Sequence, residues 1–515
     1  MGVHGHRERA IEFLRIAHLY HLGGLPTEQP HPDTRSLSRW AHDDLPRAIA
    51  ALRQVDLKAL AALRERATAI DDLARATRAT LDAGRHVFLC GCGATGRLAL
   101  SLEFLWRRRS VDADRVRSFM AGGDVALVNS LEGFEDHPDH GARQLREMGF
   151  DDGDLLIACT EGGETPYVIG ATRQAATISS NRPWFLYCNT DEALTRQVER
   201  FGRVKADPRI RKACLYVGPM ALAGSTRMQA STALQLAVGA ALLHPDVPAR
   251  EHIADFEVRV RDAHAAFLED FVRAESEIYR GGHHVLYRVR DYGITVFTDT
   301  TERAPTFSLA PFERAADPGA RPSLCYIELD EAASAGDAWR RLLNREPRAI
   351  GWPEVDPRTT SEYLQGFDFS RAARARLRAR TPDRTHHDFH IGKVGDAIRL
   401  ELRALRHDVP LDGAPELFQH LLLKQLLNIH STLVMGRLGR YEDNLMTWVT
   451  PTNGKLVDRA ARHVQHLLTN AGRPDSSYER IVERLFAEME RTEPGESVVL
   501  RTFRSLVTNG STGSG

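Results

Sequence analysis

The segment HVFLCGCGATGR, residues 86–97, decides the fold prediction. A short apolar run ends in a glycine-rich turn, and a helical stretch begins directly after it. Glycines allow a tight turn and a close approach to a ligand, and a helix N-terminus offers free N–H groups to an anion. The spacing matches neither a dinucleotide fingerprint nor a Walker loop. The segment therefore predicts a strand, a turn and a helix, with an anion bound at Gly93, Thr95 and Gly96.

Similar apolar runs continue along the chain and alternate with helical stretches. SFMAGG, DLLIACT, PWFLYC and KACLYVG follow the first run, and HHVLYRV, GITVFTD, SLCYIEL and RAIGWP form a second set. Continuous apolar runs separated by helices are typical of a parallel sheet covered on both faces. The pattern predicts an α/β protein with two parallel-sheet halves.

The pattern also predicts domain boundaries. We expect a helical arm over residues 1–84, the two α/β domains over 85–250 and 251–460, a C-terminal helical region over 461–507 and a disordered tail over 508–515. The arm is amphipathic, so it either packs on the following domain or forms a contact in a homodimer. The basic stretch 371–387 is interpreted as a solvated helix face or loop.

Composition excludes several classes of protein. The 515 residues contain 68 Lys+Arg and 69 Asp+Glu, a formal net charge of −1, so binding of nucleic acid through a global basic field is not expected. No apolar run reaches the roughly 18 residues of a membrane span, and no signal peptide is recognised. We therefore expect a cytoplasmic protein. Six cysteines form no disulfide framework and no metal-ligand spacing.

Two further loops carry polar residues after apolar runs. In the loop Thr160–Tyr167, Thr165 precedes Pro166 at the start of a helix, and the hydroxyls of Thr160 and Thr165 are expected to face the first loop. The segment 218–228 contains Ser225, Thr226 and Arg227 ahead of a long helix. A cation at a helix start opposes the helix dipole, so Arg227 needs a partner carboxylate or a ligand.

Taken together, these segments resemble a known family. GCGATGR, AGGD, EGFED, ETPYVIG and GSTRM occur in the order found in sugar-isomerase (SIS) domain proteins. Within that family the chain is similar to the N-acetylmuramic acid 6-phosphate etherases and, over both halves, to the glucokinase regulatory proteins. The resemblance implies two flavodoxin-like domains with a sugar phosphate bound between them, and no cofactor.

The resemblance also implies roles for individual residues. Glu135 matches a glutamate that transfers protons in the etherases, Thr95 and Thr160 match phosphate contacts, and Glu302 and Lys455 match sugar-phosphate contacts from the second half.

The chain departs from the etherase pattern in the second loop, at Gln229, where a lysine is usual, and on the helix after the first loop. Gly162 and Glu164 replace a serine and an arginine of the second loop, which weakens the prediction of a phosphate there. The position of the second catalytic glutamate holds Leu105, and Glu103 is the nearest candidate.

Three functions remain open at this stage. The first is a sensor that binds an amino-sugar 6-phosphate or a fructose phosphate and regulates a partner such as a sugar kinase. The alternative is an etherase-type lyase, which removes the carbon 2 proton and protonates the departing lactate oxygen. An aldose–ketose isomerase is the weaker alternative, because no His–Glu pair for that chemistry is recognised.

Overall fold

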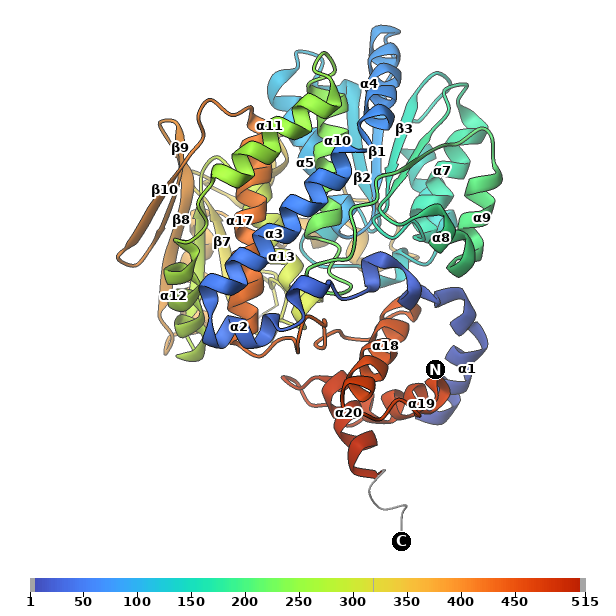
Figure 1. The fold of residues 1–515 in the computed structure, drawn as a ribbon. Coiled ribbons are helices and arrows are strands. Elements are labelled where there is room, and N and C mark those ends of the chain that lie inside the picture. Colours follow the sequence, from blue (N-terminus) through green and yellow to red (C-terminus); the bar gives the residue numbers. More distant parts are fainter. Residues whose placement is uncertain (1–4, 318, 510–515) are drawn as a thin grey trace.

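The first half of the chain folds around a five-stranded sheet that is parallel throughout (Figure 1). The structure, a computed structural model, describes residues 5–317 and 319–509, so the end of the predicted tail lies outside the described residues. The strand order is β2-β1-β3-β4-β5, the flavodoxin-like arrangement. The strands are β1 (Val87–Gly91), β2 (Val116–Met120), β3 (Leu155–Cys159), β4 (Trp184–Tyr187) and β5 (Arg211–Cys214). The helices that connect them are α5 (Ala94–Arg109), α6 (Pro138–Glu147), α7 (Pro166–Ile178), α8 (Asp191–Gln197) and α9 (Glu199–Ala206).

The second half is built on a mixed sheet with the order β10-β9-β8-β6-β7. Strand β6 pairs in parallel with β7 and β8, whereas β9 pairs antiparallel with β8 and β10. The strands are β6 (His284–Val289), β7 (Cys325–Leu329), β8 (His386–Val394), β9 (Ala397–Leu402) and β10 (Leu405–Pro410). The helices are α13 (Gly293–Phe307), α14 (Ala335–Leu343), α15 (Ser361–Gln365) and α16 (Arg371–Arg380). The predicted α/β class with two sheets is confirmed, and the second sheet differs in its antiparallel edge.

Two of the runs predicted as strands of the second half are not strands. GITVFTD begins α13, because this helix is buried on nearly all sides and its β-branched residues therefore show no helical amphipathic pattern. RAIGWP, residues 348–353, is a loop in which the Trp352 ring stacks on Phe134 of the first half.

Buried helices fill the space between the two sheets. Helices α10 (Gln229–Leu243) and α17 (Glu416–Arg437) contact each other there, and α13 packs on both α5 and α17 (Figure 1). Every residue of α10 is buried, as expected for a helix inside a core. None of the described helices has the length and apolar composition needed to cross a membrane.

The N-terminal helices pack on this central layer. Helix α3 (Leu45–Arg64) contacts α10, α11 (Ala249–Asp262), α12 (Leu268–Arg280) and α17, and α4 (Ala67–Asp82) contacts α10. Helix α2 (Leu37–Asp43) packs on α17. The arm is thus packed on the chain's own core, one of its two expected roles.

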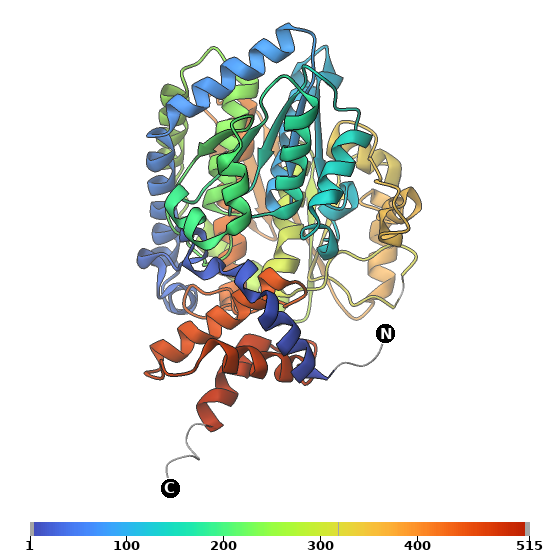
Figure 2. The ribbon, with the colours of Figure 1, turned by 90° about the vertical axis from the view of Figure 1, so that its right-hand side faces the viewer.

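The C-terminal helices form a separate cluster at one end of the molecule (Figure 2). They are α18 (Gly454–Asn470), α19 (Tyr478–Met489) and α20 (Val498–Asn509), and α1 (His6–Ile16) packs on α19. The expected boundary at residue 460 falls inside α18, because one amphipathic helix continues through it. This cluster brings the N-terminal end of α18 towards the first sheet.

Candidate functional site

Most of the loops singled out in the sequence lie around one cleft between the two halves. It is lined by the turn after β1, the ends of β2 and α18, the segment before α10, and α13. Four cationic side chains and two carboxylates line it among the described residues. They are Arg97, Arg227, Lys455 and Arg459, with Glu135 and Glu302. Of the sequence-predicted residues, the cleft also includes Gly93, Ser225 and Thr226.

The first loop turns at Gly93, which has a positive φ of 54° and precedes α5. Thr95 does not line the cleft, because its Oγ1 closes the loop on itself. This atom accepts a hydrogen bond from the Cys92 amide and donates one to the Cys92 carbonyl, both at 2.9 Å. Gly96 has a packing role, since a Cβ there would lie 2.5 Å from Cβ of Met120. Both residues shape the loop and do not face the site.

The second loop also turns its hydroxyls inward. Thr160 Oγ1 and Thr165 Oγ1 lie 3.0 Å apart, and the amide of Gly163 donates to Thr160 Oγ1 at 3.2 Å. Both threonines are buried and neither lines the cleft. The structure thus brings Thr160 and Thr165 together, as expected, but it places neither of them nor Thr95 on the wall of the cleft.

The second loop instead presents Glu164 to two cations. Lys455 Nζ lies 2.8 Å from Glu164 Oε1 and 3.0 Å from Glu135 Oε1, and Arg200 Nη2 lies 2.7 Å from Glu164 Oε2. Burial alone would raise the pKa of Glu164, but Lys455 and Arg200 outweigh it and hold that pKa at about 2. The two carboxylates likewise raise the pKa of Lys455 against the effect of its own burial. The sequence singled out Lys455, Glu135 and Glu164, but neither Arg200 nor this pairing.

Two acidic groups near this ion pair, Asp136 and Glu161, have raised pKa values. Burial raises the pKa of Asp136 to about 6, with Glu135 and Glu164 adding to the effect. Burial also raises the pKa of Glu161 to about 7, although Ser231 Oγ donates to its carboxylate at 2.7 Å. Glu161 belongs to the second loop and Asp136 follows Glu135, and neither residue lines the cleft.

A second cation of the cleft, Arg459, is held by a residue that sequence reasoning missed. Its Nε and Nη2 donate to the two carboxylate oxygens of Glu28, both at 2.8 Å. Both side chains are largely buried, and the pair ties α18 to the N-terminal segment. Nothing in the sequence links these two positions.

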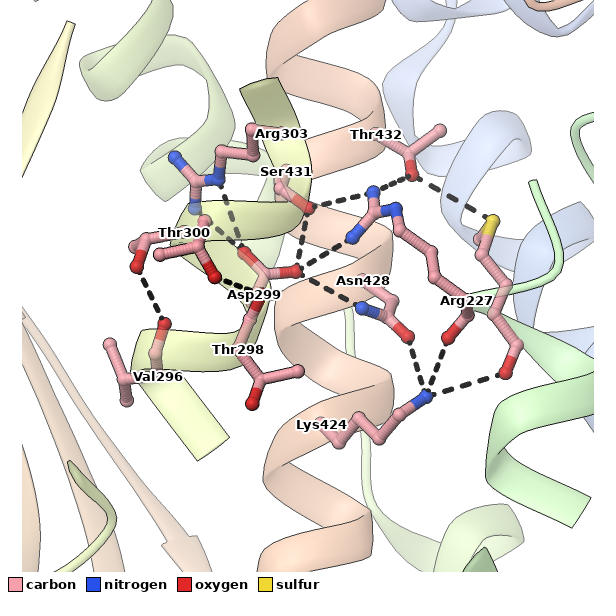
Figure 3. Close-up of polar contacts among 12 residues, drawn as sticks. Arg227, Val296, Thr298, Asp299, Thr300, Arg303, Lys424, Asn428, Ser431 and Thr432 are labelled. Atoms are coloured by element: carbon pink, nitrogen blue, oxygen red, sulfur yellow. Dashed lines mark hydrogen bonds and ion pairs between the residues drawn. The ribbon is translucent and has the colours of Figure 1, made fainter. Parts of the chain in front are cut away.

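The third loop is fixed by the second half of the chain (Figure 3). Arg227 Nη1 donates to Asp299 Oδ1 of α13 at 3.0 Å, and its Nη2 donates to Ser431 and Thr432 of α17, both at 3.2 Å. Asp299 is thus the carboxylate partner that the sequence required for Arg227. Lys424 of α17 donates to the Arg227 carbonyl at 2.8 Å. Buried charges therefore position this loop relative to α13.

The other candidate acid of the first half, Glu103, lies outside the cleft. It is 1% exposed on α5, and its carboxylate accepts from Arg345 at 3.1 Å, Arg348 at 2.8 Å and Ser118 Oγ at 2.5 Å. These contacts tie the loop after α14 to the first sheet. The assignment of Glu103 to catalysis is therefore wrong, because both of its oxygens are engaged in a buried network.

Glu302 differs from the other buried acids because it has no hydrogen-bond donor among the described residues. It lies on α13 one turn after Asp299, is 4% exposed and lines the cleft. Burial raises its pKa, and the nearby cations Arg97, Arg227 and Lys424 only partly oppose this. The cleft thus combines an ion-paired carboxylate, Glu135, with an unpaired one.

Comparison with known proteins agrees with the resemblance found in the sequence. Residues 67–176 match the family model of the glucokinase regulatory protein N-terminal SIS domain. The chain is 35% identical over 214 residues to an N-acetylmuramic acid 6-phosphate etherase of Gloeobacter violaceus, and 35% identical over 217 residues to that of Thermosynechococcus vestitus. These alignments cover 41% and 42% of this chain, and the chain spans only 65% and 66% of the two relatives.

Solved structures show a more distant similarity. The C-terminal domain of glucosamine-fructose-6-phosphate aminotransferase from Francisella tularensis is 11% identical, with a TM-score of 0.35, over 73% of this chain and 95% of that chain. The recognition of an SIS-type domain in the first half is confirmed by the family model and by the etherase relatives.

Proposed function

We propose that the cleft binds a phosphorylated amino sugar and eliminates a lactyl ether from it, as an N-acetylmuramic acid 6-phosphate etherase would. The observation that carries this proposal is Glu135, which lines the cleft with its carboxylate 3.0 Å from Lys455. Similarity to etherases over the first half supports the same chemistry.

The charges of the cleft suit such a substrate. A 6-phosphorylated muramic acid carries a phosphate and a lactyl carboxylate. The cationic side chains come from separate elements, Arg97 and Arg227 from the first half and Lys455 and Arg459 from α18. Cationic groups on separate elements can each contact one anion of the ligand, although Arg227, Lys455 and Arg459 also pair with carboxylates of the chain.

The chemistry follows from the position of Glu135. When the sugar is in its open form, the aldehyde at carbon 1 makes the carbon 2 proton removable. Glu135 would take that proton, the electron pair would form the carbon 2–carbon 3 double bond, and the lactyl oxygen would leave carbon 3. A positioned carboxylate in this role contributes about 10²–10⁴-fold to the rate.

The direct test is lactate release from N-acetylmuramic acid 6-phosphate by the purified chain. Wild type should release lactate, and Glu135→Gln should not, while its affinity for the substrate stays within a few fold. Asp139→Asn is a matched control, because this exposed acid lies four residues away and outside the cleft. Lactate release by Glu135→Gln at the wild-type rate would contradict the proposal.

A sensor is the second candidate, and the buried Leu105 favours it. This residue stands where the etherases carry their second acid, so a chain that binds a sugar phosphate without turning it over would explain the loss. A sugar kinase would be its partner. Binding of an amino-sugar or fructose phosphate, with no lactate released from the etherase substrate, would favour this candidate over the lyase.

A further inference from the structure

An elimination at carbon 3 needs an acid for the leaving oxygen as well as a base for carbon 2. Helix α5 does not supply this acid, because Leu105 occupies the expected position and Glu103 is enclosed by Arg345, Arg348 and Ser118. An alkoxide such as that of lactate leaves poorly unless it is protonated as the bond breaks. If the chain is a lyase, the acid must come from another part of the cleft.

The second half brings one carboxylate to the same cleft, that of Glu302 on α13. Charged groups near it lie on several neighbouring elements. They are Arg97 on α5, Arg227 before α10, Lys424 on α17, Asp299 on its own helix and Glu161 in the second loop. None of these cations donates a hydrogen bond to Glu302 among the described residues. The carboxyl group is therefore buried at the cleft wall without the partner that a permanently ionised acid requires.

The cations near Glu302 are engaged elsewhere. Arg227 directs both terminal nitrogens to Asp299, Ser431 and Thr432. Lys424 donates to the Arg227 carbonyl at 2.8 Å, Thr232 Oγ1 at 2.8 Å and Asn428 Oδ1 at 3.1 Å. Glu135, in contrast, is paired directly with Lys455. Two carboxyl groups in such different surroundings are typical of an acid and a base in one site.

We propose that Glu302 is the acid that protonates the departing lactate oxygen in the lyase reaction proposed above, on which this inference rests. Glu135 takes the carbon 2 proton, the carbon 3–oxygen bond breaks, and the lactyl oxygen takes its proton from Glu302. Water then adds to carbon 3 and gives a proton to the Glu302 carboxylate, while Glu135 returns its proton to carbon 2. Both acids are restored, and the net reaction is hydrolysis of the ether. The acid and the base therefore come from different halves of the chain.

The test compares two leaving groups on one sugar. One substrate is N-acetylmuramic acid 6-phosphate, and the other carries a 4-nitrophenyl ether at the same carbon, whose phenolate leaves without a proton. Glu302→Gln should slow lactate release by about 100-fold or more and leave nitrophenolate release within a few fold of wild type. Glu135→Gln should lose both activities. Glu313→Gln is the control, because this buried acid of the second half contacts Arg380 and Tyr326 outside the cleft.

The wild-type pH profile tests the inference without a variant. Lactate release should fall on the alkaline side as Glu302 loses its proton, and nitrophenolate release should lack that fall. Equal loss of both activities in a folded Glu302→Gln variant, or full retention of lactate release, would overturn the inference while leaving the lyase proposal in place. If wild type released neither lactate nor nitrophenolate, the proposed function itself would fail, and the inference with it.

Discussion

The ion pair between Glu164 and the two cations Lys455 and Arg200 leads to a quantitative prediction. The pKa of Glu164 falls from 4.5 to about 2 in the folded chain, and one pKa unit corresponds to about 1.4 kcal/mol. Glu164 is buried, so the ionised group stabilises the folded state by about 3 kcal/mol. Glu164→Gln should therefore lower the free energy of unfolding by about that amount near neutral pH.

The sign of the pH dependence follows from the lowered pKa. The stabilisation by Glu164 is complete above its unfolded pKa of 4.5 and is lost as the pH falls towards 2. Urea unfolding at about pH 6 and about pH 3.5 should show wild type losing roughly 1 kcal/mol more than Glu164→Gln does. Equal losses in the two proteins would refute the argument, because they would mean that the folded state does not favour the ionised carboxylate.

Glu161 provides a control of opposite sign in the same loop. Burial raises its pKa from 4.5 to about 7, so its ionisation destabilises the folded chain as the pH rises through that range. Glu161→Gln removes this loss and keeps an acceptor for Ser231 Oγ. The variant should be at least as stable as wild type above about pH 7, whereas Glu164→Gln should be less stable there. A destabilised Glu161→Gln at alkaline pH would contradict the assignment.

Three other variants test the site. Lys455→Met removes the cation that Glu135 and Glu164 share in the cleft. Calorimetry should then show the affinity for a sugar phosphate weakened by about 1.5–3 kcal/mol. Unchanged affinity would exclude a contact between Lys455 and the ligand. Asp299→Ala leaves buried cations unpaired and should cost about 3–5 kcal/mol in urea unfolding, with Asp299→Asn milder, and equal costs would argue against a charge effect. Gly96→Val should lower the thermal midpoint, because its Cβ would lie 2.5 Å from Met120; an unchanged midpoint would show that α5 moves freely.

The first sheet could be predicted from sequence because its strands are buried on both faces. All residues of β1 and β3 are buried, and both appear as uninterrupted apolar runs. The same reasoning failed at GITVFTD, since a helix packed between two sheets is also apolar on all sides. Periodicity carries no information at such a segment.

The sequence predicted several residues of the site but not the side-chain contacts between them. Glu135, Glu302 and Lys455 do line one cleft, whereas the threonine hydroxyls satisfy their own loops. The contact between Lys455 and Glu164 joins residues that only the fold brings together, and the sequence showed Glu164 only as a departure from a pattern. Side-chain partners across a domain interface leave no local signal in a single sequence.

In the proposed reaction, this cleft cleaves a sugar ether by elimination and hydration. The most direct measurement is the reaction with N-acetylmuramic acid 6-phosphate in water enriched in oxygen-18, followed by mass spectrometry of both products. Elimination followed by hydration should place the heavy oxygen at carbon 3 of the sugar, and lactate should keep its original oxygen. Absence of lactate, or heavy oxygen in the lactate hydroxyl, would contradict it.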